Sequence, residues 1–232
     1  MNLFDSNPPG DGVWQLDIGH EAIDYPEGTN YIVPLFEHTQ MKTHKGCGIF
    51  VGNYLITVGH VAIDSDRNPL SELYTYYNVS YIRIGNESII YDGRGKKDFD
   101  GIHDDLIVYY VPEVNSPFCL NEQDIREGQT LYTMPYDYIE ETDKVQRHGN
   151  ECTITSVHGK ELNGDNIWKN CFMVNNPCIF CSGNSGSALF RKNIVYGILI
   201  GGEGTGNNGR KYCVLDARYI KTKLDELTMQ HQ

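Results

Sequence analysis

The sequence predicts an all-β protein that ends in a single α-helix. Short runs rich in β-branched and aromatic residues recur along the chain of 232 residues, and turn signals at 52–53, 85–86 and 92–93 separate them. Many short strands with turns at this spacing are typical of β-barrels or of a β-sandwich. The segment 217–229 differs, because its apolar residues recur at helical spacing.

The expected strands form two groups. The first group lies at 31–36, 46–51, 54–58, 79–84, 87–91 and 105–111. The second group lies at 129–134, 151–157, 170–174, 188–190, 194–200 and 211–215. The region 112–128 holds two prolines and a polar run, which predicts a link between two halves.

Composition and charge narrow the classes of partner. Hydrophobic residues make up 40% of the chain, as in an ordinary globular protein, and the formal net charge is −12 at pH 7. An acidic balance argues against binding to a phosphate backbone or to an anionic membrane surface. No stretch approaches the length of a membrane span, and the N-terminal residues lack the basic start and apolar core of a signal peptide. We therefore expect neither a nucleic-acid nor a membrane partner.

Ser185 is a candidate nucleophile in the stretch 181–190. Gly183 and Gly186 lie on either side of it, and glycine adopts backbone angles that other residues resist. The backbone N–H groups of Gly183 and Ser185 could converge on one oxygen, which is the geometry of an oxyanion hole. A Gly/Ser turn before a strand has the same pattern, so this stretch alone leaves both interpretations open.

His60 is the candidate base, because it follows the β-rich run 54–58 and has small residues around it. Four other histidines lie in polar, loop-like contexts: His44, His103, His148 and His158. A lone histidine is more often structural than catalytic, and the apolar frame distinguishes His60.

Asp105 is the candidate acid that would orient His60. It directly precedes the apolar run 106–111, so its carboxylate would be partly buried and would need a hydrogen-bonding partner such as an imidazole N–H. A solvated pair of aspartates at the start of a strand is the alternative. Asp104 is the second choice for the acid.

The order His60, Asp105, Ser185 resembles that of the chymotrypsin-like serine proteases, whereas α/β-hydrolases run Ser, Asp/Glu, His. Residues 57–60 resemble the histidine box of that family, Asp105 with its strand resembles the aspartate box, and 183–187 resembles the serine box.

Two further segments extend the resemblance to about residues 30–225. Residues 46–51 resemble the strand before the histidine box, and 197–202 resemble the strand that lines the specificity pocket. Asn184 stands where the digestive members have Asp, and Glu203-Gly204 follows the pocket strand. In these features the chain is similar to bacterial heat-shock proteases, glutamyl endopeptidases and viral main proteases.

The resemblance implies two six-stranded antiparallel β-barrels with the active site between them. The expected domains are an N-terminal arm at 1–28, a first barrel at 29–115 with His60 and Asp105, a linker at 116–128, a second barrel at 129–215 with Ser185, and a C-terminal helix and tail at 216–232.

The resemblance also implies a mechanism. Ser185 attacks a peptide carbonyl, His60 takes and returns the serine proton, and Asp105 fixes the imidazole tautomer. The N–H groups of Gly183 and Ser185 hold the oxyanion. No metal or organic cofactor is required. The expected partner is a protein or peptide substrate, with a regulatory protein or a parent polyprotein as further candidates. A catalytically inactive peptide-binding module and a serine esterase are the alternative functions.

The specificity pocket is expected to contain Ile179, Phe180, Leu199 and Gly201. Ile179 matches the position that holds Asp in trypsin-like members, and Leu199 matches the position that holds His in members that cut after Glu or Gln. The resemblance therefore implies cleavage after apolar or aromatic residues.

Digestive members are activated when cleavage frees an amino terminus that pairs with the Asp beside the nucleophile. Asn184 cannot make that ion pair, and Pro34 departs from the glycine pattern of the new terminus. We therefore expect that no cleavage near residue 32 is needed for activity.

The chain has seven cysteines. Cys47 matches a bridged position of secreted relatives, but Val61 stands where its partner would be. Cys181 likewise finds no cysteine in the matching loop at 201–209. Free thiols fit a reducing, cytoplasmic compartment. The C-x-x-C at 178–181 has the spacing of a zinc half-site, but only the irregularly spaced Cys171 and Cys213 could complete it, so no metal is expected.

Overall fold

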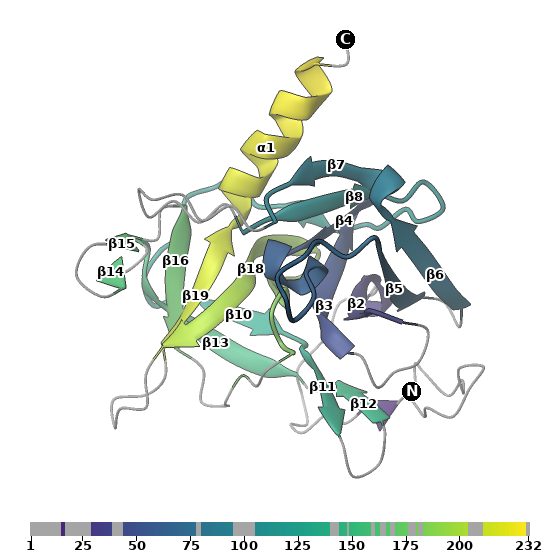
Figure 1. Ribbon diagram of the computed structural model, residues 1–232. Helices are drawn as coiled ribbons and strands as arrows, with labels where there is room; N and C mark the ends of the chain where they lie inside the picture. Colours follow the sequence, from purple (N-terminus) through teal and green to yellow (C-terminus); the bar gives the residue numbers. More distant parts are fainter. Residues whose placement is uncertain are drawn as a thin grey trace.

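The computed structural model describes residues 15–16, 29–38, 44–77, 80–94, 105–139, 144–147, 149–158, 161–162, 166–167, 170–175, 180, 183–203 and 211–230. These residues form mostly β-strands and one α-helix, α1 (Ala217–Gln230). The predicted all-β fold with a C-terminal helix is therefore confirmed. Figure 1 shows two β units side by side, with α1 above them.

The N-terminal unit is a seven-stranded sheet that curves into a half-barrel. Its strand order is β6-β5-β2-β3-β4-β8-β7, and all neighbours are antiparallel. The strands are β2 (Ile32–Phe36), β3 (His44–Val51), β4 (Tyr54–Thr57), β5 (Glu72–Tyr77), β6 (Ser80–Gly85), β7 (Ile89–Asp92) and β8 (Ile107–Tyr110). Every residue of β2 is buried, which places this strand in the core of the unit.

The C-terminal unit is a closed antiparallel barrel of six strands. The strands are β10 (Thr130–Thr133), β13 (Asn150–Ser156), β16 (Cys171–Asn175), β17 (Ala188–Arg191), β18 (Ile194–Glu203) and β19 (Lys211–Asp216). Strand β17 pairs with both β10 and β18, and this double pairing closes the barrel. Alternation along β10, with Leu131 and Thr133 buried and Thr130 exposed, follows the period of two that a barrel wall requires.

Several elements were not predicted, among them the six-residue strand β5 of the first unit. The linking region contains β9 (Cys119–Leu120), which pairs in parallel with β18. A separate three-stranded sheet joins β1 (Gln15–Leu16), β12 (Lys144–Arg147) and β11 (Tyr136–Ile139). The remaining elements are β14 (Glu161–Leu162), β15 (Asn166–Ile167) and the 3₁₀ turns η1 (Thr29–Tyr31), η3 (Gly59–Ala62) and η4 (Asn86–Ser88). A strand of two residues is too short to show a period of two in the sequence. Its position depends on pairing with strands that are distant along the chain.

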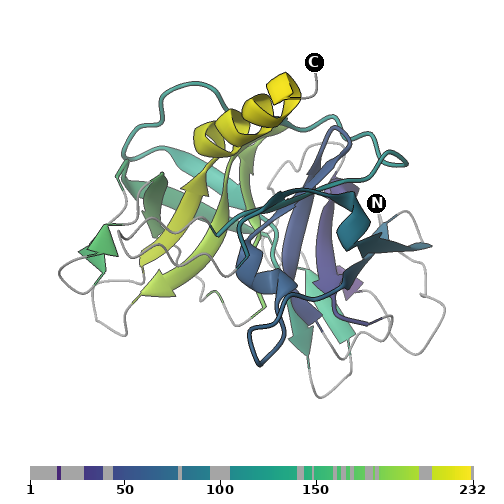
Figure 2. The same ribbon diagram turned by 45° about the horizontal axis from the view of Figure 1, so that its top comes forward.

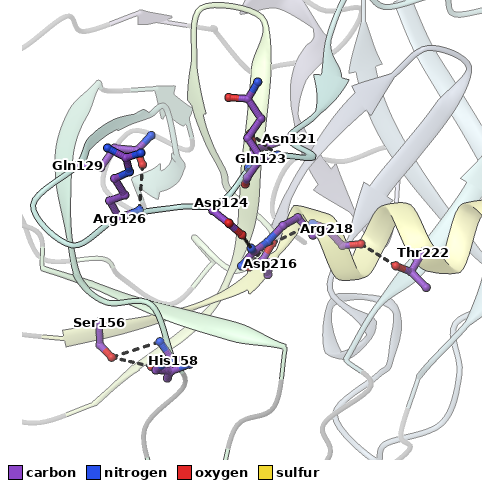
Figure 3. Close-up of polar contacts among 10 residues, drawn as sticks. All are labelled: Asn121, Gln123, Asp124, Arg126, Gln129, Ser156, His158, Asp216, Arg218 and Thr222. Atoms are coloured by element: carbon purple, nitrogen blue, oxygen red, sulfur yellow. Dashed lines mark hydrogen bonds and ion pairs between the residues drawn. The ribbon is translucent and has the colours of Figure 1, made fainter.

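Helix α1 connects the two units. It begins after Asp216, whose carboxylate accepts the backbone N–H of Arg218 at 2.8 Å, as an N-cap side chain does. The Arg218 guanidinium pairs with Asp216 and with Asp124 of the linking region, and Thr222 bonds back to the Arg218 carbonyl (Figure 3). The helix contacts β7 of the first unit and β9, β18 and β19 on the other side, across the top of both units (Figure 2). No helix in the described ranges has the length and apolar character to cross a membrane.

Candidate active site

His60 lies in η3, directly after β4. The neighbours Gly59, Val61 and Ala62 are buried, while the His60 side chain is 40% exposed. The turn is closed by a 3.2 Å hydrogen bond from the Val61 N–H to the Val58 carbonyl. Buried neighbours and this hydrogen bond therefore surround an imidazole that remains partly exposed.

Asp105 binds His60 through both carboxylate oxygens. Its Oδ1 accepts the His60 backbone N–H at 2.8 Å, and its Oδ2 lies 2.5 Å from Nδ1 of the ring. The Asp105 side chain is only 16% exposed. A Cβ on Gly59 would lie 3.1 Å from Oδ1, so the absence of a side chain there permits the close approach. Asp104 lies outside the described residues.

Ser185 lies in a turn that is fastened to β18. Gly183 and Gly186 adopt φ of 97° and 85°, where L side chains are strained. The Gly186 N–H donates to the Leu199 carbonyl at 2.8 Å, and the Leu199 N–H donates to the Ser187 carbonyl at 2.8 Å. These bonds fix the start of β17 and leave Ser185 at the tip of the turn.

The Ser185 hydroxyl donates to the Ile200 carbonyl at 3.3 Å. Within the described part of the chain, no hydrogen bond joins Ser185 to His60. The two segments are nevertheless close, because a Cβ on Gly46 would lie 2.7 Å from the Ser185 carbonyl oxygen and 2.5 Å from a methyl group of Val61. Catalytic hydrogen bonds are often incomplete in the absence of substrate.

The N–H groups of Gly183 and Ser185, predicted to form an oxyanion hole, belong to this turn and are separated in the chain by Asn184. Among the described residues neither N–H has a hydrogen-bond acceptor, whereas the N–H groups of Gly186 and Ser187 both have one.

Asn184 supports the turn through buried hydrogen bonds that the sequence did not reveal. Its side chain is fully buried, and Nδ2 donates to the Tyr136 carbonyl at 2.9 Å and to the Asp137 carboxylate. The Ser187 hydroxyl donates to the Asn184 carbonyl at 2.6 Å. Both the side-chain amide and the main-chain carbonyl of Asn184 are therefore hydrogen-bonded. Strand β11, which supplies the acceptors of the amide, was absent from the predicted strands.

Cys47 of β3 lies on the other side of the turn. Its thiol donates to the Gly183 carbonyl at 3.5 Å and accepts the Tyr136 N–H at 3.3 Å. Burial raises the pKa of the Cys47 thiol to about 11, so it remains protonated at neutral pH. A neutral buried thiol is a packing and hydrogen-bonding group and not a nucleophile.

His44 corrects an expectation, because it does not lie in a polar loop. It begins β3, its ring packs against Phe36 in a tilted arrangement with centroids 5.6 Å apart, and a Cβ on Gly183 would lie 3.1 Å from its Nδ1. Burial lowers its pKa to about 4, and Nε2 has no hydrogen-bond partner among the described residues. The burial arises from contacts with Phe36 and Gly183, which local sequence does not encode.

The predicted pocket residues that the structure describes lie in different environments. Phe180 and Leu199 are buried in the core of the barrel. The Phe180 ring meets Tyr212 edge to face at 4.6 Å, and its N–H donates to the Tyr212 hydroxyl at 3.1 Å. A Cβ on Gly201 would meet no atom of the described residues within 4 Å. Ile179 lies outside the described residues. Tyr212 was not identified from the sequence.

Five cysteines are free thiols in the structure: Cys47, Cys119, Cys152, Cys171 and Cys213. The C-x-x-C pair, Cys178 and Cys181, lies outside the described residues. Within the described ranges, no group of three His, Cys, Asp or Glu side chains is arranged to hold a metal ion.

Comparison with known proteins gives a structural match and no sequence match. No family model matches the chain, and no curated protein matches it. Neuropsin, a serine protease of mouse brain, superposes with a TM-score of 0.64 at 14% identity, covering 92% of this chain and 100% of neuropsin. The active form of the Rv3671c protease of M. tuberculosis gives 0.61 at 14% identity, covering 98% of this chain and 93% of that one.

A mutant of human heparin binding protein also matches, with a TM-score of 0.60 at 13% identity and coverage of 88% and 93%. At these identities the comparisons show the fold, which is that of the chymotrypsin-like proteins. Two of these three proteins are named as proteases and the third for binding, so the function of this chain must be argued from its own residues.

Proposed function

We propose that this protein is a serine endopeptidase in which Ser185 is the nucleophile, His60 the general base and Asp105 the orienting acid. The observation that carries the proposal is the double hydrogen bond between His60 and Asp105. A carboxylate only accepts hydrogen bonds, so the ring proton lies on Nδ1 and Nε2 is left as the basic nitrogen. A second bond to the His60 backbone keeps the acid in place while the ring changes charge.

Ser185 takes part in the mechanism once its hydroxyl leaves the Ile200 carbonyl. His60 would then accept the proton of Oγ as Oγ attacks the peptide carbonyl. The N–H groups of Gly183 and Ser185 then stabilise the oxyanion, and the imidazolium gives its proton to the leaving amine. This chemistry needs no metal and no organic cofactor.

The apolar character of Phe180 and Leu199, two of the expected pocket residues, supports cleavage after an apolar or aromatic residue. The side chain that precedes the scissile bond would lie beside Gly201, where a Cβ would meet no atom of the described residues within 4 Å. Burying an apolar side chain contributes about 1.5–3 kcal/mol, which sets the discrimination expected. A cleavage profile on a diverse peptide library tests this preference, and a profile dominated by basic or by Glu and Gln residues contradicts it.

Asn184 supports a place on the bacterial and viral side of the family, because the charged residue of the digestive members is replaced. The substrate is a protein or peptide, and a parent polyprotein or a regulatory protein would be the source of control. The binding-only alternative has support from the match to heparin binding protein.

A fluorophosphonate probe separates these functions. We expect the wild-type chain to be labelled at Ser185, and Ser185→Ala to lose both labelling and peptide cleavage, since loss of the nucleophile costs about 10⁴–10⁶ in turnover. Peptide mapping of the labelled protein distinguishes Ser185 from the buried Ser187. A folded wild-type protein that is not labelled would identify a binding module, and hydrolysis of simple esters without any peptide cleavage would identify an esterase.

A further inference from the structure

The main chain of Tyr136 holds the nucleophile turn from two sides. Its carbonyl accepts Nδ2 of Asn184 at 2.9 Å, and its N–H donates to the Cys47 sulfur at 3.3 Å. Cys47 in turn donates its N–H to the Ser185 carbonyl at 2.8 Å and its thiol to the Gly183 carbonyl at 3.5 Å. The three consecutive residues 183–185 are thus bound to Cys47 or to Tyr136.

The side chain of Tyr136 is fixed by a buried cation. Its hydroxyl donates to the Ile32 carbonyl at 3.1 Å and accepts a hydrogen bond from Arg147 at 3.2 Å. The Arg147 guanidinium also lies over the Tyr136 ring, 5.5 Å from its centroid. Arg147 is only 1% exposed, so the free-energy cost of burying its charge has to be offset by the partners that surround it.

Arg147 extends the chain of contacts to the segment before β2. It donates to the Thr29 carbonyl at 2.7 Å and to the Thr29 hydroxyl at 3.4 Å, and Thr29 is itself buried. Removing an acceptor from a buried guanidinium leaves a charged donor unsatisfied, which destabilises the folded state. We therefore expect these contacts to form or break together. The segment 29–32, the sheet of β11 and β12, and the turn at Ser185 are therefore one connected unit.

We propose that Tyr136 and Arg147 are positioning residues that set the geometry of the Ser185 turn through Asn184 and Cys47. The inference rests on the proposed function, because the turn matters for catalysis only if Ser185 is the nucleophile. Neither residue touches the substrate. They keep the N–H groups of Gly183 and Ser185 convergent, and Thr29 belongs to the same support. A cut between Thr29 and Ile32 would therefore weaken the turn.

The test compares three variants of the full chain. Arg147→Met removes the charge and the donors at similar length, Arg147→Lys keeps the charge, and Tyr136→Phe removes only the hydroxyl while the main-chain bonds to Asn184 and Cys47 remain. Arg83→Met is the matched control, because Arg83 on β6 is 53% exposed and pairs with Glu72 and Glu87, away from the turn.

Two measurements are made on each variant: hydrogen exchange of residues 183–187 by mass spectrometry, and the rate of fluorophosphonate labelling with kcat and KM for a peptide. We expect Arg147→Met to accelerate exchange in 183–187 and to lower the labelling rate and kcat at least tenfold, with KM changed little. Arg147→Lys recovers part of the loss, and Tyr136→Phe falls between wild type and Arg147→Met. Arg83→Met behaves as wild type in both measurements.

Exchange and labelling at wild-type values in Arg147→Met and Tyr136→Phe would overturn the inference and leave the proposed function standing. If the wild-type chain is not labelled, the proposed function fails, and the exchange of 183–187 still decides whether Tyr136 and Arg147 hold the turn. If Arg147→Met does not fold, Arg147→Lys and Tyr136→Phe decide it alone.

Discussion

The backbone N–H of Cys47 donates a 2.8 Å hydrogen bond to the carbonyl oxygen of Ser185. Cys47 belongs to β3 of the N-terminal sheet and Ser185 to the turn before β17 of the barrel. This one bond therefore couples the unit that carries His60 to the unit that carries the proposed nucleophile. A small displacement between the units would move Ser185 relative to the imidazole.

Gly46→Ala tests this coupling. The new methyl group would lie 2.7 Å from the Ser185 carbonyl oxygen, which is backbone and cannot swing away, and 2.5 Å from Val61. We expect a loss of stability of about 1–3 kcal/mol, as for other overpacked sites, and a larger proportional loss of activity. Chemical denaturation and peptide assays measure the two effects. Gly201→Ala controls for stability, because its methyl group would meet no atom of the described residues within 4 Å, and equal destabilisation in both variants would contradict the prediction.

Asp105→Asn should remove most of the activity and leave the fold intact. The amide can offer an N–H where the carboxylate accepts Nδ1–H of His60, which favours the wrong tautomer. In the template enzyme the equivalent change costs about 10⁴ in kcat. We expect a loss of similar order, measured as kcat on a peptide with circular dichroism to verify folding. Asp104→Asn is the control, and a greater loss in that variant would make Asp104 the orienting acid.

The buried His44 predicts a decline in stability at acid pH. Its pKa is lowered from 6.5 to about 4 by burial, so between these values the unfolded chain binds the proton and the folded chain does not. The contribution of His44 to stability therefore rises with pH across this window. It is complete above pH 6.5 and is lost as the pH falls toward 4. The full effect is on the order of 3 kcal/mol.

His44→Asn checks the contribution of this one group. Urea denaturation of wild type and variant at pH 4.5 and pH 7.5 gives the change in unfolding free energy for each. We expect the decrease between the two pH values to be smaller in the variant by about 1–3 kcal/mol, since all other groups are common to both proteins. Equal decreases would show that His44 does not titrate in this range.

The predictable part of the fold followed from local pattern. Apolar β-rich runs located β3, β4 and β8, and helical spacing located α1. Strand β11 was missed because its sequence signal is short and an acidic run follows it at 140–143. Its importance lies in the bond that Tyr136 accepts from Asn184 and the bond that it donates to Cys47, and both partners are distant in sequence.

The residues of the site also divide into those that local sequence pattern identified and those that it could not identify. His60 and Asp105 could be found because each lies at the end of an apolar strand, and the structure brings them into contact. His44, Tyr136 and Arg147 could not be found, because their environment is made by residues far along the chain. Arg147 in particular occurs in a polar stretch, and its burial depends on Thr29 and Tyr136.

The free thiols should differ sharply in reactivity. Cys119 is exposed, whereas Cys47 is buried with its pKa raised to about 11, so it offers almost no thiolate at neutral pH. Mass mapping after brief iodoacetamide treatment should show Cys119 modified and Cys47 unmodified in the native protein, and both modified after denaturation. Cys119→Ser is the control for the fast reaction. We propose a reducing, cytoplasmic setting for these thiols, and finding Cys47 in a disulfide of freshly purified protein would contradict it.

The intact chain should be active without cleavage near residue 32. Ile32 already begins β2 and is in register with Ile49 of β3, so the segment enters the sheet directly. Asn184 already donates to the Tyr136 carbonyl and to the Asp137 carboxylate, so the turn is supported by groups within the chain and not by a freed amino terminus. Intact-mass spectrometry of fluorophosphonate-labelled protein should therefore find the label on the full chain of 232 residues. Label confined to a form that begins at Ile32 would show that cleavage activates the protein, and label that requires an added protein would place control in assembly.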